Sequence, residues 1–257
     1  MHLEVWHLGL LAAIGIVAGI LNVVAGGGSL LTLPTMIFMG LPEAVANGTN
    51  RLAIFAQNIS AVFGFQKQGF SNFKLSATLA LAAIPGAVMG AYMGAVIRGT
   101  LFNRILALVM IAAIVWMFLE ERFKKSKAPQ RSSTPPPSLS RARAIGGHLG
   151  MVAIGFYGGF IQAGVGFLLI AVLNTMSLDL VRVNMHKVFI VASFTLIALI
   201  VFILHGKVWW IPGFCLAIGN SLGGWIGSQL AVARGEAFIR KILHIALAAM
   251  AIKLLFD

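Results

Sequence analysis

The chain has 257 residues, of which 59% are hydrophobic and only 10% are charged. Its mean hydropathy of +0.95 exceeds what the surface of a water-soluble domain tolerates, so the composition excludes a soluble fold. The excess of 19 Lys and Arg over 7 Asp and Glu suggests nucleic acid binding only in a soluble protein. Basic residues of membrane proteins gather in cytoplasmic loops, so we expect the lipid bilayer as a partner and no nucleic acid.

Ten apolar runs follow one another along the chain. A spanning helix needs about 20 apolar residues to cross a hydrocarbon core of about 30 Å, so the length allows about eight to ten crossings. We therefore expect an all-α polytopic membrane protein. The runs lie at 8–24, 30–39, 44–65, 75–97 and 101–119, and again at 149–163, 167–176, 188–204, 208–232 and 238–256.

A basic segment separates the two sets of runs. Residues 120–143 contain seven Lys or Arg and four prolines, a composition typical of a flexible cytoplasmic connector. The sequence thus predicts a first transmembrane repeat at 1–119, a cytoplasmic linker at 120–143 and a second transmembrane repeat at 144–257.

The two halves match in detail, which indicates an internal duplication. With five segments in each half, fourteen of the 19 basic residues fall on the linker side and five on the other. Because positive charge stays inside, this favours two inverted repeats with both termini outside. The matches pair AGGGSLL from Ala25 with AGVGFLL from Ala163, Asn47 with Asn184, Gly69 with Gly206, and Gly86, Gly90 and Gly94 with Gly219, Gly223 and Gly227.

Each half begins with short, interrupted runs. Gly26, Gly27 and Gly28, and then Pro34, interrupt the first pair, and Gly164, Gly166 and Asn174 stand at the corresponding places of the second. Broken helices at matching positions of two repeats are the usual sequence pointer to a substrate site, because their ends present free backbone groups. The alternative is that the glycines only allow close helix packing.

Cations stand inside apolar surroundings at related positions of the two halves. Ionisable groups within a membrane are costly unless they are paired or hydrated, so Arg51 and the pair His186 and Lys187 suggest an anion site. The alternative is that they lie at the membrane boundary and reach the headgroups. We expect the substrate site to include Asn22, Gly26, Gly27, Gly28, Ser29, Asn47, Thr49, Asn50, Arg51, Gln162, Asn184, His186 and Lys187.

Other motifs have plainer interpretations. Glu43 and Asp179 look like caps of the helices that follow them, with proton coupling as the alternative. Glycines at every fourth residue after Pro85 and Gly219 are typical of close helix packing. The six histidines are scattered, and the sequence has no metal motif, no ATP-binding motif and no catalytic cluster. We expect no cofactor and no bound metal.

The order AGGGSLLTLP, GLPEAVANGTNR, GFQKQGF and PGAVMGAYMG resembles the TauE/SafE sulfite exporter family. The resemblance implies a transporter of sulfite, sulfoacetate or other sulfonates in the bacterial inner membrane. We expect a secondary exporter that works by alternating access. The alternatives are an anion channel, a membrane assembly factor or an intramembrane enzyme, and a homodimer is possible. The second half departs from the family motifs, which implies that the first repeat carries more of the binding.

Overall fold

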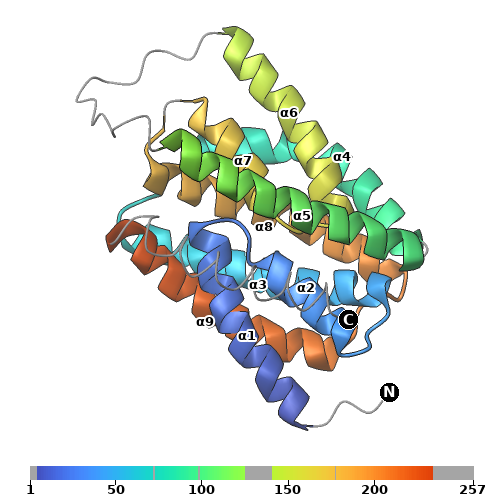
Figure 1. Ribbon diagram of the computed structural model, residues 1–257. Helices are drawn as coiled ribbons and strands as arrows, with labels where there is room; N and C mark the ends of the chain where they lie inside the picture. The colour runs from blue at the N-terminus through green and yellow to red at the C-terminus, as the bar shows by residue number, and fades with distance from the viewer. Residues whose placement is uncertain (1–4, 72, 98, 125–140, 177, 234–257) are drawn as a thin grey trace.

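The fold is described from a computed structural model, for residues 5–71, 73–97, 99–124, 141–176 and 178–233 (Figure 1). Every element of these residues is an α-helix, as the hydropathy predicts. In chain order the helices are α1 (Val5–Val24), α2 (Ser29–Phe38), α3 (Glu43–Lys67), α4 (Lys74–Val96), α5 (Gly99–Lys124), α6 (Arg141–Phe160), α7 (Val165–Asn174), α8 (Leu180–Leu204) and α9 (Trp210–Ala233).

One order of helix lengths occurs twice. Helices α1 to α4 have 20, 10, 25 and 23 residues, and α6 to α9 have 20, 10, 25 and 24. The short second helix of each set follows a break in the chain, as predicted. The expectation that Pro34 interrupts the second run is wrong, because Pro34 lies inside α2. Residues 125–140 of the predicted linker and the last predicted segment, 238–256, lie outside the described residues.

Helices of one half pack mainly against helices of the other. Helix α1 packs along α9, and its counterpart α6 packs along α4. Helix α3 contacts α9 just as α8 contacts α4, and α3 and α8 contact each other at the centre. Each of these contacts between the halves therefore has a counterpart in which the roles of the two halves are reversed.

Glycines allow the two long seams, α1 with α9 and α4 with α6. A Cβ at Gly86 or Gly90 of α4 would overlap a carbonyl oxygen of α6, from Val152 or Phe156. A Cβ at Gly219 of α9 would likewise overlap the carbonyl oxygen of Ala12 in α1. Only glycine permits helices to approach so closely, so these residues form packing seams, as the sequence indicates.

The central helices α3 and α8 run in opposite directions. Phe202, near the end of α8, lies beside Gly48, near the start of α3. At the other end, Phe73 follows α3 and stacks on Phe189 in the first half of α8, with 5.0 Å between ring centroids. The start of one central helix thus lies beside the end of the other.

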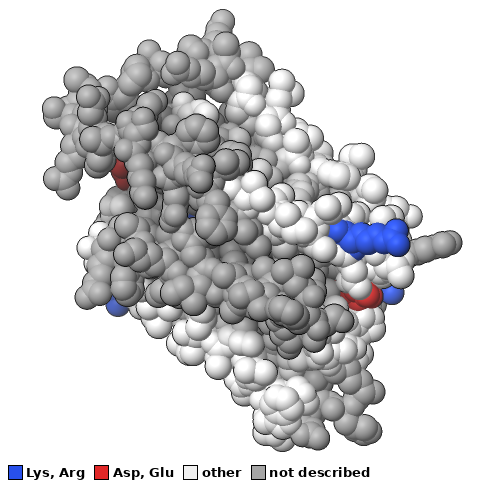
Figure 2. Space-filling view, in the orientation of Figure 1, with Lys and Arg blue, Asp and Glu red and all other residues white. Residues whose placement is uncertain are grey.

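The outer surface suits lipid. Helices α1, α4 and α8 are each long and apolar enough to cross a membrane. Large apolar side chains are exposed along the helices, including Leu81, Met89, Leu108 and Ile218. On the face shown in Figure 2, the charged side chains of the described residues lie toward the left and right ends of the molecule. The chain is therefore a multi-pass membrane protein.

Candidate functional site

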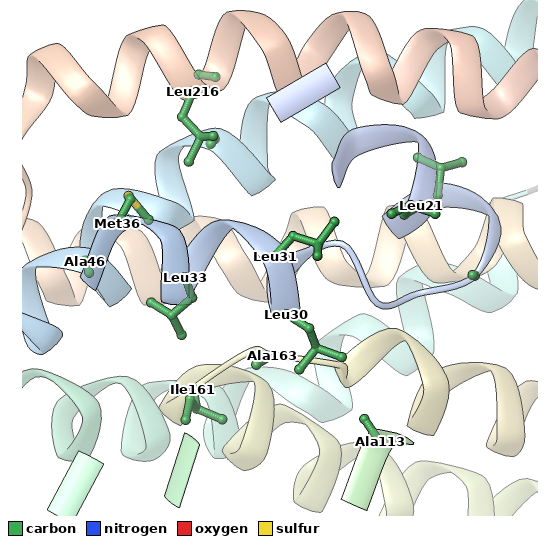
Figure 3. Packing of buried hydrophobic residues seen from close by; sticks show 14 of the residues in the cluster. Leu21, Leu30, Leu31, Leu33, Met36, Ala46, Ala113, Ile161, Ala163 and Leu216 are labelled. Atoms are coloured by element: carbon green, nitrogen blue, oxygen red, sulfur yellow. The ribbon is translucent and has the colours of Figure 1, made fainter. Parts of the chain in front are cut away.

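The two breaks in the chain meet at the middle of the molecule. Gly26, with φ of +88°, lies in the connection between α1 and α2, and Gly166 is the second residue of α7. A Cβ at Gly26 would lie 2.6 Å from the carbonyl carbon of Gly166, so the two backbones are in direct contact. Figure 3 shows Leu30 of α2 close to Ala163, in the connection between α6 and α7. We call this place, formed by residues 25–28 and 161–164, the junction.

Arg51 joins α3 to the end of α6. Its side chain is fully buried. Its two Nη groups donate hydrogen bonds to the carbonyl oxygens of Gly158, at 2.7 Å, and Gly159, at 2.6 Å. The last carbonyls of a helix have no partner within the helix and form the negative end of its dipole. A planar guanidinium with forked donors therefore stabilises the end of α6.

Polar and aromatic neighbours fix the Arg51 side chain. Nη1 also donates to Oε1 of Gln162 at 2.9 Å, and Nη2 donates to Oδ1 of Asn47 at 3.3 Å. The amide of Asn47 in turn donates to the carbonyl oxygen of Phe160 at 2.8 Å. The guanidinium lies 4.9 Å from the ring centroid of Phe202, which adds a cation–π contact. The Nε of Arg51 has no hydrogen-bond partner.

Lys187 does for α1 what Arg51 does for α6. Its side chain is 2% exposed, and Nζ donates to the carbonyl oxygen of Val23, at 2.7 Å, near the end of α1. Nζ also donates to Oδ1 of Asn184 at 2.7 Å. Each central helix thus sends a cation, together with an asparagine, to the end of the first helix of the other half.

Neither buried cation has an acidic partner among the described side chains. Two acids fall within this part of the chain, and both are engaged elsewhere. Glu43 accepts a hydrogen bond from Asn103 at 2.7 Å, and Asp179 caps α8 by accepting from the backbone N–H of Arg182 at 3.0 Å. The prediction that Asp179 is a helix cap is confirmed. The same prediction for Glu43 is wrong, because Glu43 is the first residue of α3 and Pro42 is at the cap position. Only neutral oxygens surround the two cations.

Three side-chain amides meet beside the junction, and of these only Asn22 is among the predicted site residues. Oε1 of Gln57 accepts from the side-chain amides of Asn22, at 3.2 Å, and Asn220, at 3.3 Å. All three are buried, and Nε2 of Gln57 and Oδ1 of Asn220 have no partner. Ser29, the first residue of α2, also has an unpartnered hydroxyl. Single amides within apolar runs are the signal that would have pointed to Gln57 and Asn220.

The structure separates the predicted site residues into two groups. Thr49 accepts a hydrogen bond from the backbone N–H of Trp209 at 2.9 Å, Asn50 accepts from Thr32 at 2.8 Å, and His186 bonds to Ser76 at 2.6 Å. These three side chains are bonded to residues outside the junction: Trp209 before α9, Thr32 of α2 and Ser76 of α4. The group that lies at or against the junction is Asn22, Gly26, Gly27, Gly28, Ser29, Asn47, Arg51, Gln162, Asn184 and Lys187.

The junction contains the donors that an oxyanion needs. Guanidinium, ammonium and amide N–H groups lie buried at this place, where electrostatic interactions are stronger than in water. In the described part of the chain, no three His, Cys, Asp or Glu side chains are placed to hold a metal ion. In the structure, carbonyl oxygens near the ends of α6 and α1 accept hydrogen bonds from the two cations.

Known relatives are similar to this chain along almost its whole length. "Probable membrane transporter protein YfcA" of Escherichia coli strain K12 is 30% identical over 254 residues, which cover 97% of this chain and 90% of that protein. "Probable membrane transporter protein ORF9" of Sinorhizobium sp is 29% identical over 242 residues, covering 94% and 89%. A relative from Haemophilus influenzae is 25% identical over 258 residues, covering 100% and 98%. No solved structure matches.

The family model described as sulfite exporter TauE/SafE matches residues 11–254, from α1 to beyond α9. This range includes both breaks, both central helices and both buried cations. The resemblance seen in the sequence motifs is therefore confirmed. The chain belongs to the sulfite exporter TauE/SafE family and is a membrane transporter of that type.

Proposed function

We propose that this protein is a secondary transporter that exports small organosulfur anions, such as sulfite or a sulfonate, across the bacterial inner membrane. The observation that carries the proposal is the pair of buried cations, Arg51 and Lys187, with no acidic partner among the described side chains. A cation inside a membrane protein is costly unless something negative compensates it. A substrate anion supplies that compensation.

The hydrogen-bond geometry favours an oxyanion over a spherical anion. Arg51 presents a planar fork, which fits two oxygens of a sulfite or sulfonate group. At present the two Nη groups are bonded to the carbonyls of Gly158 and Gly159, which are neutral. At an effective dielectric constant of about 20, two unit charges at about 4 Å attract each other by about 4 kcal/mol. That attraction is of the same order as the two charged hydrogen bonds to carbonyls that the anion would replace, at about 1.5–3 kcal/mol each.

The arrangement of the halves supports alternating access between two inverted repeats. The central helices α3 and α8 are antiparallel, and each half's cation holds the other half's first helix. A rocking movement of one half against the other would change both contacts at once. A membrane potential that is negative inside favours the efflux of an anion by about 2.3 kcal/mol per charge per 100 mV. Export therefore needs no nucleotide.

A binding experiment tests the anion class. In detergent, sulfite and sulfoacetate should raise the unfolding temperature of the protein in a saturable way, because they bind only the folded state. Acetate at the same ionic strength is the control for the charge alone. Equal shifts with sulfite and acetate would remove the preference for sulfur oxyanions, and no shift with any anion would contradict the proposed site.

A flux experiment separates a transporter from the channel alternative. Liposomes that contain the purified protein should take up labelled sulfite at a rate that saturates as its concentration rises. Unlabelled sulfite inside the liposomes should accelerate the uptake, because exchange bypasses the return of the empty carrier. A rate that stays proportional to sulfite concentration would favour a channel. No protein-dependent uptake would favour an assembly role.

A further inference from the structure

A polar cavity opens at one end of the central helices. It has a volume of about 540 Å³ and lies between the turn after α3 and the start of α8. Lys74, at the start of α4, lines it from the first half of the chain, and Arg182 and His186 of α8 line it from the second. Ser71 adds a hydroxyl, and Leu178 forms part of an apolar wall. We call this cavity the basic pocket.

The charge of the basic pocket is that of an anion site. Its three ionisable lining residues are all bases. One acid is nearby, since Asp179 pairs with Nε of Arg182 at 3.2 Å. That contact uses one edge of the guanidinium and leaves the planar fork of Nη groups for another acceptor. The Arg182 side chain is 58% exposed, so an anion in solution can reach it.

The corresponding place at the opposite end of the central helices is closed. Lys207 stands 12 residues before Gly219, as Lys74 stands 12 residues before Gly86. A Cβ at Gly48 would overlap the carbonyl oxygen of Lys207, so the backbones of the two halves touch there. The hydrogen bond from Trp209 to Thr49 closes the same end. The two ends are thus built from matching segments, yet the described residues pack more closely at the Thr49 end.

Helix α8 connects the basic pocket to the junction. His186 is 5% exposed and forms part of the pocket lining, where it is held by its 2.6 Å hydrogen bond to Ser76. The next residue, Lys187, reaches the end of α1 at the junction. Arg182 therefore stands five residues before the buried cation Lys187 on the same helix, about 7.5 Å along its axis.

The pocket end is the end toward which α5 runs. Asn103, near the start of α5, contacts Glu43 at the start of α3, and Ala113 of α5 lines a cavity together with Ala163 at the junction. The basic linker follows α5, and its charge predicts a cytoplasmic position. The basic pocket then faces the cytoplasm.

We propose that the basic pocket is a second oxyanion-binding site, distinct from the junction, which captures the substrate from the cytoplasm before it passes to Lys187. The proposal rests on the proposed export function. It assigns to Lys74, Arg182 and His186 the first binding step, and to Arg51 and Lys187 the buried one. A change in capture at the exposed site should therefore change the KM for the substrate and leave the maximal rate at saturation nearly unchanged.

Flux measurements on charge variants test this assignment. Sulfite flux is measured in liposomes of neutral lipid, with the pocket side identified by protease treatment of the linker. For flux from the pocket side, Arg182→Gln and Lys74→Gln should each raise the KM for sulfite about tenfold, as expected for the loss of a charged hydrogen bond, and leave the maximal rate within about twofold. Asp179→Asn should lower the KM, because it removes a competing carboxylate while asparagine still caps the helix. Lys207→Gln, the matched change at the closed end, should leave this KM unchanged.

Ionic strength distinguishes the exposed site from the buried one. Raising it from about 0.01 M to about 1 M shortens the Debye length from about 30 Å to about 3 Å. The difference in KM between wild type and Arg182→Gln should then shrink by more than half. An unchanged KM in both Arg182→Gln and Lys74→Gln, with wild-type flux intact, would overturn the pocket proposal alone. An absence of sulfite flux in the wild type would instead contradict the proposed function.

The phosphate groups of lipid headgroups are oxyanions, as sulfite is. A separate experiment therefore distinguishes a bound lipid from the free anion. Sulfite binding is measured in nanodiscs of phosphatidylcholine alone and of phosphatidylcholine with phosphatidylglycerol. Binding that persists in the neutral discs and weakens in Arg182→Gln supports a site for the free anion. If Arg182→Gln changes only the number of retained phosphatidylglycerol molecules, measured by native mass spectrometry, the pocket is a lipid site and the proposal fails.

Discussion

The two halves of the chain share a framework but differ in the chemistry they place on it. In both, a glycine seam holds the fourth helix against the first helix of the other half, and a cation from the third helix reaches the end of that first helix. The cation is the arginine Arg51 in one half and the lysine Lys187 in the other. The amide cluster around Gln57 has no equivalent at the matching place, where α8 has Phe194. The framework is therefore shared, and we propose that substrate binding depends more on the first half.

The glycine seams should be the most sensitive part of the framework, and equally so in both halves. Gly90→Leu and Gly223→Leu each force a side chain into a carbonyl oxygen, of Phe156 or Ile16. Overpacking against backbone should cost more than about 3 kcal/mol, enough to prevent folding. The measurement is the yield of monodisperse protein on size exclusion. Gly150→Leu is the control, since nothing lies within 4 Å of that position, and it should fold. A folded Gly90→Leu beside an unfolded Gly223→Leu would break the equivalence.

The two cations should differ in their effect on transport. Arg51→Gln removes a fork that makes four hydrogen bonds, whereas Lys187→Gln removes a group that makes two. If the fork gives the anion two charged hydrogen bonds and the ammonium gives it one, at about 1.5 kcal/mol or more each, sulfite flux should fall at least about 100-fold for Arg51→Gln and about tenfold for Lys187→Gln. Arg51→Lys, which keeps the charge without the fork, should fall between wild type and Arg51→Gln. Equal losses for both glutamine variants would contradict the greater dependence of substrate binding on the first half.

The amide cluster around Gln57 gives a second test of the difference between the halves, through the unfolding temperature of the protein. Gln57→Leu removes the acceptor of two buried amides, from Asn22 and Asn220. An unsatisfied buried group costs about 1–3 kcal/mol, so the unfolding temperature should fall by roughly 4–8 °C. Gln66→Leu is the control on the same helix, because Gln66 is exposed and should change the unfolding temperature little. A neutral Gln57→Leu would mean that the cluster is not dry and that water satisfies its amides.

The smallest expected effects are at the two ends of the central helices. Thr49→Val leaves the backbone N–H of Trp209 without its acceptor, and Ser76→Ala leaves His186 without its hydroxyl partner. Each should lower the unfolding temperature by about 2–4 °C, the effect of about 1 kcal/mol. Thr49→Ser keeps the hydroxyl and should recover most of the loss. A much larger effect at one end would show that the two contacts are not equivalent.

Repetition and polarity in the sequence were enough to predict the framework. The runs, the short second helix of each half and the glycine seams follow from local composition, because hydropathy and helix breaking are local properties. The break at Gly26 was predicted, but its contact with Gly166 was not. That contact joins residues far apart in the chain, and only the packing of α1, α3, α8 and α9 brings them together.

The residues of the candidate site were predicted better than their arrangement. Arg51 and Lys187 were expected to belong to an anion site, and the structure adds that both are buried and bonded to helix-terminal carbonyls. Sequence reasoning treats a cation by its own surroundings, and the partners here are backbone groups more than 100 residues away. His186 was predicted to lie with Lys187, but adjacent residues of a helix face different directions, and it lines the basic pocket instead.

The central claim is that an anion crosses the membrane through a junction whose positive charge comes from Arg51 and Lys187, with Arg51 contributing more of the binding. The direct measurement is the flux of labelled sulfite into sealed liposomes, driven by an imposed membrane potential, for wild type and Arg51→Gln at equal amounts of folded protein. We expect saturable, potential-dependent flux in the wild type and almost none in Arg51→Gln, with Arg51→Lys in between. Wild-type flux through a folded Arg51→Gln protein would contradict the account.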